Sequence, residues 1–208
     1  MFVLGLIGRT GSGKSTAARA LERDGAVVVD ADALGHEVTD HDPEVRLGLA
    51  SEYGSDVYLP DGRLDRARVA ARVFTDPAAL ARLDRLVHPR IVARIRSRLE
   101  ELRAAGFDGV VILDAALLLD WGLERWCDAV IAVVAPESEQ IARLEAARGW
   151  TESQARRRLS VQRSPDALRS VADETLENRG SPEELEALAR EACLRLRRRH
   201  ATTGREAC

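Results

Sequence analysis

The sequence predicts an α/β protein with a three-layer fold around a five-stranded parallel sheet. Apolar stretches rich in β-branched residues recur at residues 2–7, 26–32, 109–115 and 128–135, and a short fifth strand is expected at 174–178. Helical sequence separates the first four stretches, and strands that are joined through helices pair in parallel. With 208 residues and 45% hydrophobic content, the chain is large enough to enclose a substantial core, and we expect one globular unit.

The first strand leads into a glycine-rich loop. Residues 8–16 read GRTGSGKST and fit the phosphate-loop pattern G-x-x-x-x-G-K-S/T, and residues 14–25 read as an amphipathic helix that ends at Gly25. The backbone N–H groups of such a loop surround a phosphate chain, and the helix N-terminus adds positive potential. Lys14 is the only lysine in the chain, and its compact ammonium suits the space between the β- and γ-phosphates better than the planar guanidinium of arginine.

Two strands are predicted to end in carboxylates near this loop. The second strand is predicted to run through residue 32, and period-two alternation turns Asp30 and Asp32 to the same side of its carboxyl end, beside the phosphate loop. A carboxylate there could accept a hydroxyl proton or orient water on magnesium; the alternative is that both residues only cap the following helix. Asp114 ends the third strand, where it would bind magnesium indirectly through a water ligand or act as a simple turn residue.

A long insertion separates the second and third strands. Its roughly seventy residues exceed an ordinary crossover, so they should form a helical substructure. We expect helices at 42–54 and 66–74, a turn at 59–65, and helical sequence at 76–106 that is interrupted near Pro89. The predicted division is one phosphate-loop domain with a core at about 1–34, 108–138 and 171–200, an insertion at about 35–107, and a helical flap, or lid, at about 139–170.

The predicted lid is rich in arginine. Helices are expected at 136–149 and 151–164, the second with the capping-box spacing of Thr151 and Gln154, and the last helix starts with a similar box at Ser181 and Glu184. Arginines beside a phosphate site can neutralise a phosphoryl group as a lid closes, although most of them should be ordinary solvated charge. Those of this segment are Arg143, Arg148, Arg156, Arg157, Arg158, Arg163 and Arg169.

Composition narrows the class of protein. The net charge of −3 with interspersed charges does not resemble a nucleic-acid binder, and three widely spaced cysteines argue against a disulfide framework or a zinc site. The first residues lack the basic lead of a signal peptide and no apolar run reaches membrane-spanning length, so we expect a cytoplasmic protein without membrane partners.

Three classes of phosphate-loop protein remain to be separated. A switch GTPase would normally carry N-K-x-D, which a chain with a single lysine at position 14 lacks. The composition does not favour an oligomeric motor ATPase. A small-molecule kinase is the leading interpretation.

The residues resemble the dephospho-CoA kinase family over nearly the whole chain. The resemblance is carried by GLIGRTGSGKST, VVVDADALGHEV, DGRLDRARVAARVF, LVHPRIVARI, LDAALLLDWGL, CDAVIAVVAPESEQIARL and SVQRSPDALRSVADETLENRG, in that order. It implies a nucleotide core, a helical substrate part and a lid. It also implies ATP-dependent phosphorylation of the ribose 3′-hydroxyl of dephospho-CoA, with Mg²⁺ as cofactor and ATP and dephospho-CoA as small-molecule partners. We expect a monomer, with an oligomer left open.

The resemblance also implies roles for individual residues. Asp32 would be the base, with Lys14 and Arg143 as the other catalytic groups. Arg66 and His88 would join Asp32 in binding the acceptor, although a structural role for Arg66 and His88 is an equal alternative. The residues implied to hold ATP are Gly11, Ser12, Gly13, Lys14, Ser15, Thr16, Asn178 and Gly180. Ser15 would also bind magnesium directly, and Asp114 would bind it indirectly through water.

The chain departs from the family pattern at several positions. Ile7 and Arg9 stand where the family usually has Thr and Gly, and Ala116 and Asp120 stand where it usually has Pro and Glu. Arg9 would either crowd the nucleotide or point outward and add positive charge. Two alternatives to the predicted activity follow: a divergent kinase for another nucleoside or ribosyl hydroxyl, and a weakly active ATP-binding regulator.

Overall fold

The computed structural model describes residues 1–73 and 76–206, and it contains two compact units. The first, Met1–Val29 with Phe107–Cys208, contains the sheet, and we call it the sheet unit. The second, Asp30–Gly106, is helical, and we call it the helical unit. Phe74, at the end of the predicted helix 66–74, and Cys208 lie outside the described residues. Among the described residues, no helix combines the length and the apolar character needed to cross a bilayer.

The sheet has the order β2-β3-β1-β4-β5. Its strands are β1 (Phe2–Ile7), β2 (Val27–Asp30), β3 (Val110–Asp114), β4 (Ala129–Val134) and β5 (Glu174–Glu177). The pairings of β1 with β3, β1 with β4 and β4 with β5 are parallel. The α/β prediction with a five-stranded parallel sheet is therefore confirmed. The chain passes from β1 to β2 and β3 on one side of β1 and then to β4 and β5 on the other side. The loop after β1 therefore opens at the switch point where α/β proteins bind ligands.

Both faces of the sheet are covered. Even-numbered residues of β1, such as Leu4 and Leu6, pack in a cluster with α1 (Lys14–Arg23) and α9 (Pro182–Glu206), which contact each other. On the other face, Gly5 lies against Leu118 and Cys127 from the segment between β3 and β4. Burial on both faces explains why these strands are continuously apolar rather than alternating.

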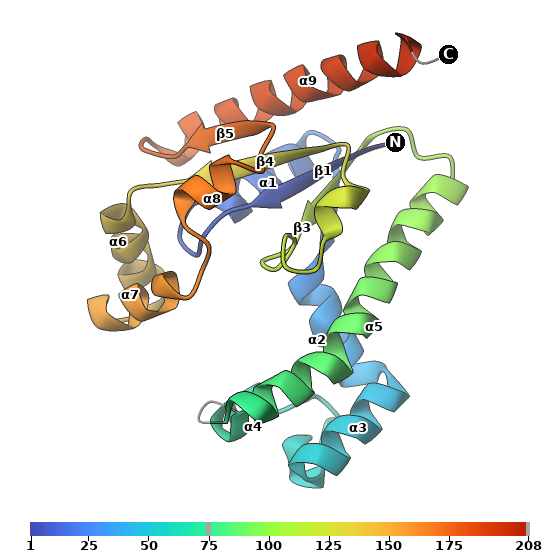
Figure 1. The fold of residues 1–208 in the computed structure, drawn as a ribbon, viewed down its shortest axis with the longest axis vertical. Helices are drawn as coiled ribbons and strands as arrows, with labels where there is room; N and C mark the ends of the chain where they lie inside the picture. Colours follow the sequence, from blue (N-terminus) through green and yellow to red (C-terminus); the bar gives the residue numbers. More distant parts are fainter. Residues whose placement is uncertain (74–75, 207–208) are drawn as a thin grey trace. The chain divides into compact units, whose positions relative to one another are not determined.

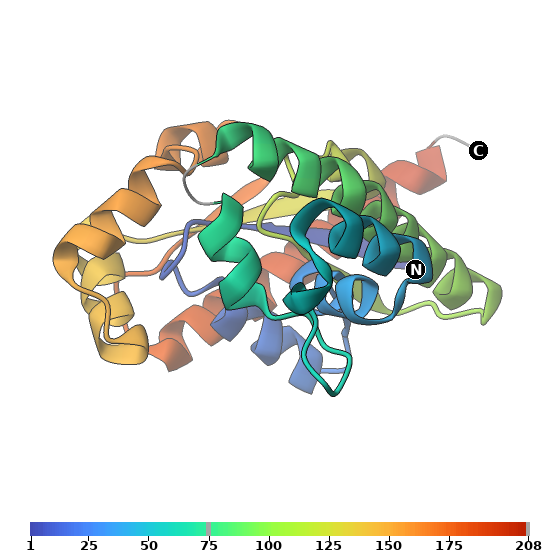
Figure 2. The same cartoon turned by 90° about the horizontal axis from the view of Figure 1, so that it is seen from below.

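A pair of neighbouring helices, α6 (Glu137–Arg148) and α7 (Glu152–Ser160), follows β4 (Figure 2). Ile141, Leu144, Ala155 and Leu159 form a small core between them. The predicted capping box of Thr151 and Gln154 is present, and α8 (Pro165–Arg169) leads back to β5. The capping box predicted at Ser181 and Glu184 is also confirmed. The two helices α6 and α7, which we call the α6–α7 hairpin, thus have a core of their own. Hydrogen bonds of residues 9–11 join this hairpin to the loop after β1.

The helical unit consists of α2 (Ala31–His41), α3 (Pro43–Tyr53), the short 3₁₀ helix η1 (Ser55–Val57), α4 (Arg66–Val73) and α5 (Pro77–Ala104). Contrary to the prediction, α5 is not interrupted and runs through Pro89. A proline inside a helix removes one backbone hydrogen bond and costs about 3 kcal/mol. Val87, Ile91, Ile95 and Leu99 bury one face of α5, and the helix packs on α2 and α3. This burial of the flanking turns offsets the cost of Pro89.

Candidate active site

The phosphate loop links β1 to α1 and has the backbone that its glycines allow. Gly11 and Gly13 have φ angles of 78° and 103°, in the left-handed region that favours glycine. A Cβ at Gly11 would come within 2.9 Å of the Gln140 carbonyl oxygen on α6. Helix α1 begins at Lys14 and has no acidic residue in its first turn. The positive end of its dipole is therefore not neutralised by its own sequence, which suits a phosphate ligand.

Lys14 forms an ion pair with Asp114, and both side chains are largely buried. The sheet explains this pairing, because Asp114 stands opposite Leu6 in the β1–β3 register, beside the start of the loop. Asp114 is therefore not an unpartnered turn residue. A carboxylate in this position restricts the rotamers of the lysine and holds its ammonium at the phosphate loop.

Ser15 and Thr16 occupy the first turn of α1, next to Lys14. The Ser15 side chain is exposed. One hydroxyl, together with phosphate oxygens and water, is a ligand set that suits Mg²⁺, which keeps several waters and binds few protein groups at phosphate sites.

Arg143 lies on α6 and contacts the loop directly. Its Nη1 donates to the Gly11 carbonyl at 3.2 Å, and its Nη2 donates to Glu139 Oε2 at 2.8 Å. Among the arginines of the predicted lid, the structure thus brings this one to the phosphate loop through a main-chain contact. Its side chain is about one third exposed, so the guanidinium retains access to solvent.

Asn178 fixes the phosphate loop from the other side. Its Nδ2 donates to the Ser12 carbonyl at 2.7 Å, its backbone N–H donates to the Val134 carbonyl, and the residue is buried. A Cβ at Gly13 would collide with this amide, which is a second reason for glycine there. Gly180 follows in the turn before α9, where a Cβ would overlap the Glu184 carboxylate of the capping box. Part of the role of Asn178 is therefore to position the loop.

Asp30 and Asp32 do not lie on one strand, so the prediction that strand alternation places their side chains together is wrong. Strand β2 ends at Asp30 and α2 begins at Ala31, so Asp32 lies in the first turn of a helix and not on the strand. Alternation along a strand therefore does not place the two side chains together. Asp30 caps α2, because its Oδ1 accepts hydrogen bonds from the N–H groups of Asp32 and Ala33. Asp32 is exposed.

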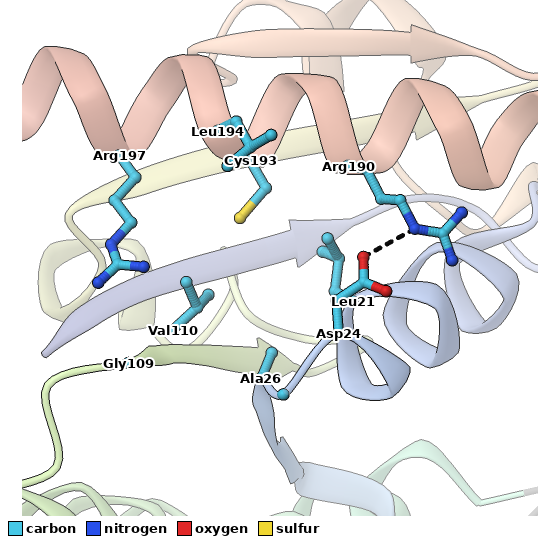
Figure 3. Close-up of a pocket in the computed structure, with 10 residues that line it drawn as sticks. Leu21, Asp24, Ala26, Gly109, Val110, Arg190, Cys193, Leu194 and Arg197 are labelled. Atoms are coloured by element: carbon cyan, nitrogen blue, oxygen red, sulfur yellow. Dashed lines mark hydrogen bonds and ion pairs between the residues drawn. The ribbon is translucent and has the colours of Figure 1, made fainter.

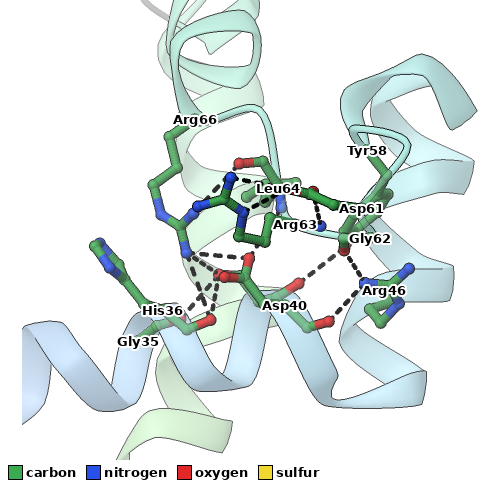
Figure 4. A network of polar contacts seen from close by, with 11 residues as sticks. Gly35, His36, Asp40, Arg46, Tyr58, Asp61, Gly62, Arg63, Leu64 and Arg66 are labelled. Atoms are coloured by element: carbon green, nitrogen blue, oxygen red, sulfur yellow. Dashed lines mark hydrogen bonds and ion pairs between the residues drawn. The ribbon is translucent and has the colours of Figure 1, made fainter.

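Arg66 and His88 belong to the helical unit. Figure 4 shows Arg66 reaching from the start of α4 toward α2, where Nη2 contacts Thr39 Oγ1 at 3.0 Å and Asp40 Oδ1 at 3.1 Å. His88 Nε2 lies 3.2 Å from Asp84 Oδ1, one turn earlier on α5. Both side chains have structural partners, and their proposed acceptor contacts remain predictions.

Arg9 points away from the interior of the loop. Its guanidinium lies against α6 and α7, with Nη2 2.9 Å from the Leu159 carbonyl oxygen and 3.6 Å from Glu137 Oε2. Asp120, another departure from the family pattern, accepts hydrogen bonds from Arg163 just beyond α7. The unusual residue at position 9 was visible in the sequence, but its partners, about 130 to 150 positions away, were not.

The sheet unit also has a cavity of about 290 Å³ at the opposite, amino-terminal edge of the strands (Figure 3). It lies between the end of α1, the start of β3 and α9. Its lining is Leu21, Asp24, Gly25, Ala26, Gly109, Val110, Arg190, Cys193, Leu194 and Arg197. Arg190 is engaged by Asp24 at 2.7 Å, and Arg197 donates to the Asp108 carbonyl. This cavity is separate from the phosphate loop, which lies at the carboxyl ends of the strands.

Comparison with known proteins decides between the kinase classes that this geometry allows. Residues 2–184 match the family model described as dephospho-CoA kinase. The chain belongs to the dephospho-CoA kinase family. It is 42% identical over 200 residues to the dephospho-CoA kinase of Thermobifida fusca, covering 96% of this chain and 98% of that protein. It is 38% identical over 190 residues to the dephospho-CoA kinase of Corynebacterium efficiens, covering 91% and 94% of the two chains.

Solved structures share the fold of this chain. The protein TT1252 from Thermus thermophilus is 31% identical and superposes with a TM-score of 0.76 over 94% of this chain and 97% of its own. Dephospho-CoA kinase from Campylobacter jejuni, at 18% identity, has a TM-score of 0.65 over 93% and 96% of the two chains and supports the fold. The family match and these relatives show that the chain is an enzyme, a P-loop kinase.

Proposed function

We propose that this kinase transfers the γ-phosphoryl group of ATP to the ribose 3′-hydroxyl of dephospho-CoA, yielding ADP and coenzyme A. The observation that carries the proposal is the phosphate loop with Lys14 held by Asp114, in a chain whose relatives are dephospho-CoA kinases. In this reaction the ribose oxygen forms a bond to phosphorus. The bond from phosphorus to the bridging oxygen breaks, and its electron pair leaves with ADP.

Each role follows from the chemistry of the side chain. The N–H groups of Gly11–Thr16 would hold the phosphates, and the Lys14 ammonium would stabilise charge on the β- and γ-phosphates. The Arg143 guanidinium, tied to the Gly11 carbonyl, would add positive charge beside them. Ser15 would hold magnesium, which supplies electrostatic stabilisation of the phosphoryl oxygens when it is bound. The backbone near Asn178 and Gly180 would line the adenine.

Asp32 is the proposed base. Its carboxylate is exposed and is not the group that caps α2, so it is available to accept the proton of the attacking hydroxyl. Arg66 and His88 are the proposed acceptor contacts from the helical unit. Asp114 would keep Lys14 in place and contribute to the surroundings of the magnesium ion.

The test is a comparison of acceptors. Purified protein with ATP and magnesium should convert dephospho-CoA to coenzyme A, measured by chromatography, and should use adenosine or AMP far less well. Lys14→Ala and Lys14→Arg should lose transfer, by about 100-fold or more for Lys14→Ala, while keeping the far-UV circular dichroism of the parent. The arginine variant tests shape, because it keeps the charge but not the compact ammonium.

Brisk transfer to another hydroxyl compound, with none to dephospho-CoA, would contradict the proposed acceptor. Nucleotide binding without transfer to any acceptor would instead indicate a regulator. Undiminished transfer by Lys14→Ala would contradict the assignment of the phosphate loop.

A further inference from the structure

Arg9 is an unusual cation within the phosphate loop, and its side chain is 10% exposed. The guanidinium touches both helices of the α6–α7 hairpin, because Leu159 is in the last turn of α7 and Glu137 is the first residue of α6. A helix C-terminus carries partial negative charge, so a cation at the Leu159 carbonyl is favourable. The buried Nε of Arg9 has no hydrogen-bond partner in the described structure. Burial of this group without a partner opposes stability, so stabilising the fold does not by itself explain this side chain.

The two neighbouring loop residues contact the same hairpin. The Thr10 N–H donates to Gln162 Oε1, and Gln162 Nε2 donates to Thr10 Oγ1, both at 3.1 Å. The Gly11 carbonyl accepts from Arg143. Three consecutive residues of the phosphate loop are therefore joined to the hairpin or its immediate flank. Arg9 contacts the end of α7 and the start of α6, Thr10 contacts Gln162 two residues beyond α7, and Gly11 contacts the middle of α6.

These contacts connect two parts of the site that would each present positive charge to the phosphates. The loop presents main-chain N–H groups to the phosphates, and the hairpin carries Arg143. The core between α6 and α7 is small and is formed within the hairpin itself. This core lies within the hairpin, whereas the hydrogen bonds and ion pair of Arg9, Thr10 and Gly11 join the hairpin to the loop. Among them, the Arg9 contact is the one that reaches both helices.

We propose that Arg9 is a positioning residue, which fixes the α6–α7 hairpin against the phosphate loop and thereby aligns Arg143 for phosphoryl transfer. The proposal rests on the phosphoryl transfer proposed above. Arg9 acts through the hairpin and not by contact with the phosphates, since its guanidinium is occupied by Leu159 and Glu137. Small displacements of a group that stabilises transferring charge are costly, and a shift of about 1 Å can reduce a rate 100-fold.

A double-mutant cycle tests this coupling. Arg9→Ala and Arg143→Ala should each reduce kcat/KM for ATP by roughly 10-fold to 100-fold, and the double variant should be little worse than Arg143→Ala alone. Arg9→Lys should recover part of the loss, because one ammonium can reach the Leu159 carbonyl but does not span both helices. The matched control is Arg198→Ala, an exposed arginine on α9, which should match the parent. Independent, multiplicative losses at Arg9 and Arg143 would overturn the proposal.

Hydrogen exchange supplies a readout that needs no turnover. In Arg9→Ala, and also in Gln162→Ala, the amides of α7 should exchange at least several-fold faster than in the parent. Those of α1 and α9 should be unchanged, which shows that the sheet unit is folded. Unchanged exchange of α7 in both variants would overturn the proposal even if activity fell. If the parent protein does not phosphorylate dephospho-CoA, the proposed function is wrong. The exchange experiment would still show whether Arg9 holds the hairpin against the loop, because it does not depend on activity.

Discussion

At the residue scale, Asp30 and Asp32 are two similar carboxylates whose surroundings give them different tasks. Asp30 ends β2 and accepts two main-chain hydrogen bonds from the first turn of α2. Asp32 is already part of that turn, and its side chain is exposed. A carboxylate that caps a helix is held in one orientation, whereas one in the first turn is free to meet a substrate and gains from the positive helix end.

We predict that Asp32→Asn lowers kcat by about 100-fold or more and changes ATP affinity little, because the amide keeps the size but does not take up the proton. Asp30→Asn should have a small effect, since asparagine caps helices as well as aspartate does. Steady-state kinetics and nucleotide titration would measure both. Asp30→Ala is the control for the cap, and it should cost about 1 kcal/mol in the free energy of unfolding without a comparable loss of kcat. A larger kinetic loss at Asp30→Asn than at Asp32→Asn would move the base to Asp30.

At the element scale, a polar network holds the turn before α4 against α2 in the helical unit (Figure 4). Asp40 on α2 accepts from the Leu64 N–H at 2.9 Å and from Arg66, while Arg46 on α3 donates to the Asp40 carbonyl at 2.6 Å. Burial by itself raises the pKa of Asp40, but the hydrogen bonds from Leu64 and Arg66 and the charge of Arg66 outweigh it, and the pKa is lowered. The network therefore favours an ionised Asp40.

The sign of this shift gives a pH dependence. A carboxylate with a lowered pKa in the folded state contributes stability that is fully present above its ordinary value of 3.8 and is lost as the pH falls through the lowered value. We predict that Asp40→Asn reduces the free energy of unfolding at neutral pH by about 1 to 2 kcal/mol, and that this difference from the parent shrinks below about pH 4. Urea unfolding across this range would measure it.

Asp61→Asn is the matched control for Asp40→Asn. Asp61 lies in the same turn, but its carboxylate is exposed and pairs with the nearby Arg63. Its replacement should leave the neutral-pH stability nearly unchanged, because exposed pairs contribute little. Equal losses for the two variants would mean that the Asp40 network does not hold this turn.

At the scale of the whole molecule, the two described cysteines mark the two faces of the sheet. Cys193 on α9 belongs to the cluster with α1, and Cys127 lies beside Gly5 on the other face. Both are free thiols. Burial raises the pKa of Cys127 to about 12 and also raises the pKa of Cys193. Since the thiolate is the reactive form, neither residue should behave as a nucleophile in the folded protein.

We predict that iodoacetamide at about pH 8 alkylates Cys127 and Cys193 at least 100-fold more slowly in the native protein than in urea. Peptide mass spectrometry would follow each site separately, and the urea sample is the control for reagent and peptide recovery. Rapid labelling of Cys193 alone would indicate that α9 opens from the sheet. Rapid labelling of Cys127 alone would indicate that the segment after β3 opens instead.

The sequence by itself determined the sheet strands, the phosphate loop and the family, because these depend on local patterns. A continuous apolar run indicates a strand buried on both faces, and glycines around Lys14 indicate a phosphate loop, whatever the rest of the chain does. Lys14 and Arg143 were candidate site residues from the sequence. In the structure Lys14 forms an ion pair with Asp114, and Arg143 donates a hydrogen bond to the Gly11 carbonyl of the phosphate loop. Their catalytic roles remain predictions.

Only the tertiary structure decided which partner each polar side chain takes. Asn178 binds the Ser12 carbonyl and Arg9 the Leu159 carbonyl, each at least 150 positions away, so no local pattern indicates them. Helix α5 continues through Pro89, because burial of its flanking turns outweighs the local cost of the proline. Asp32 lies on a helix, because the Asp30 cap ends the strand early. In each case a contact or cap that appears only in the folded chain overrides the local preference.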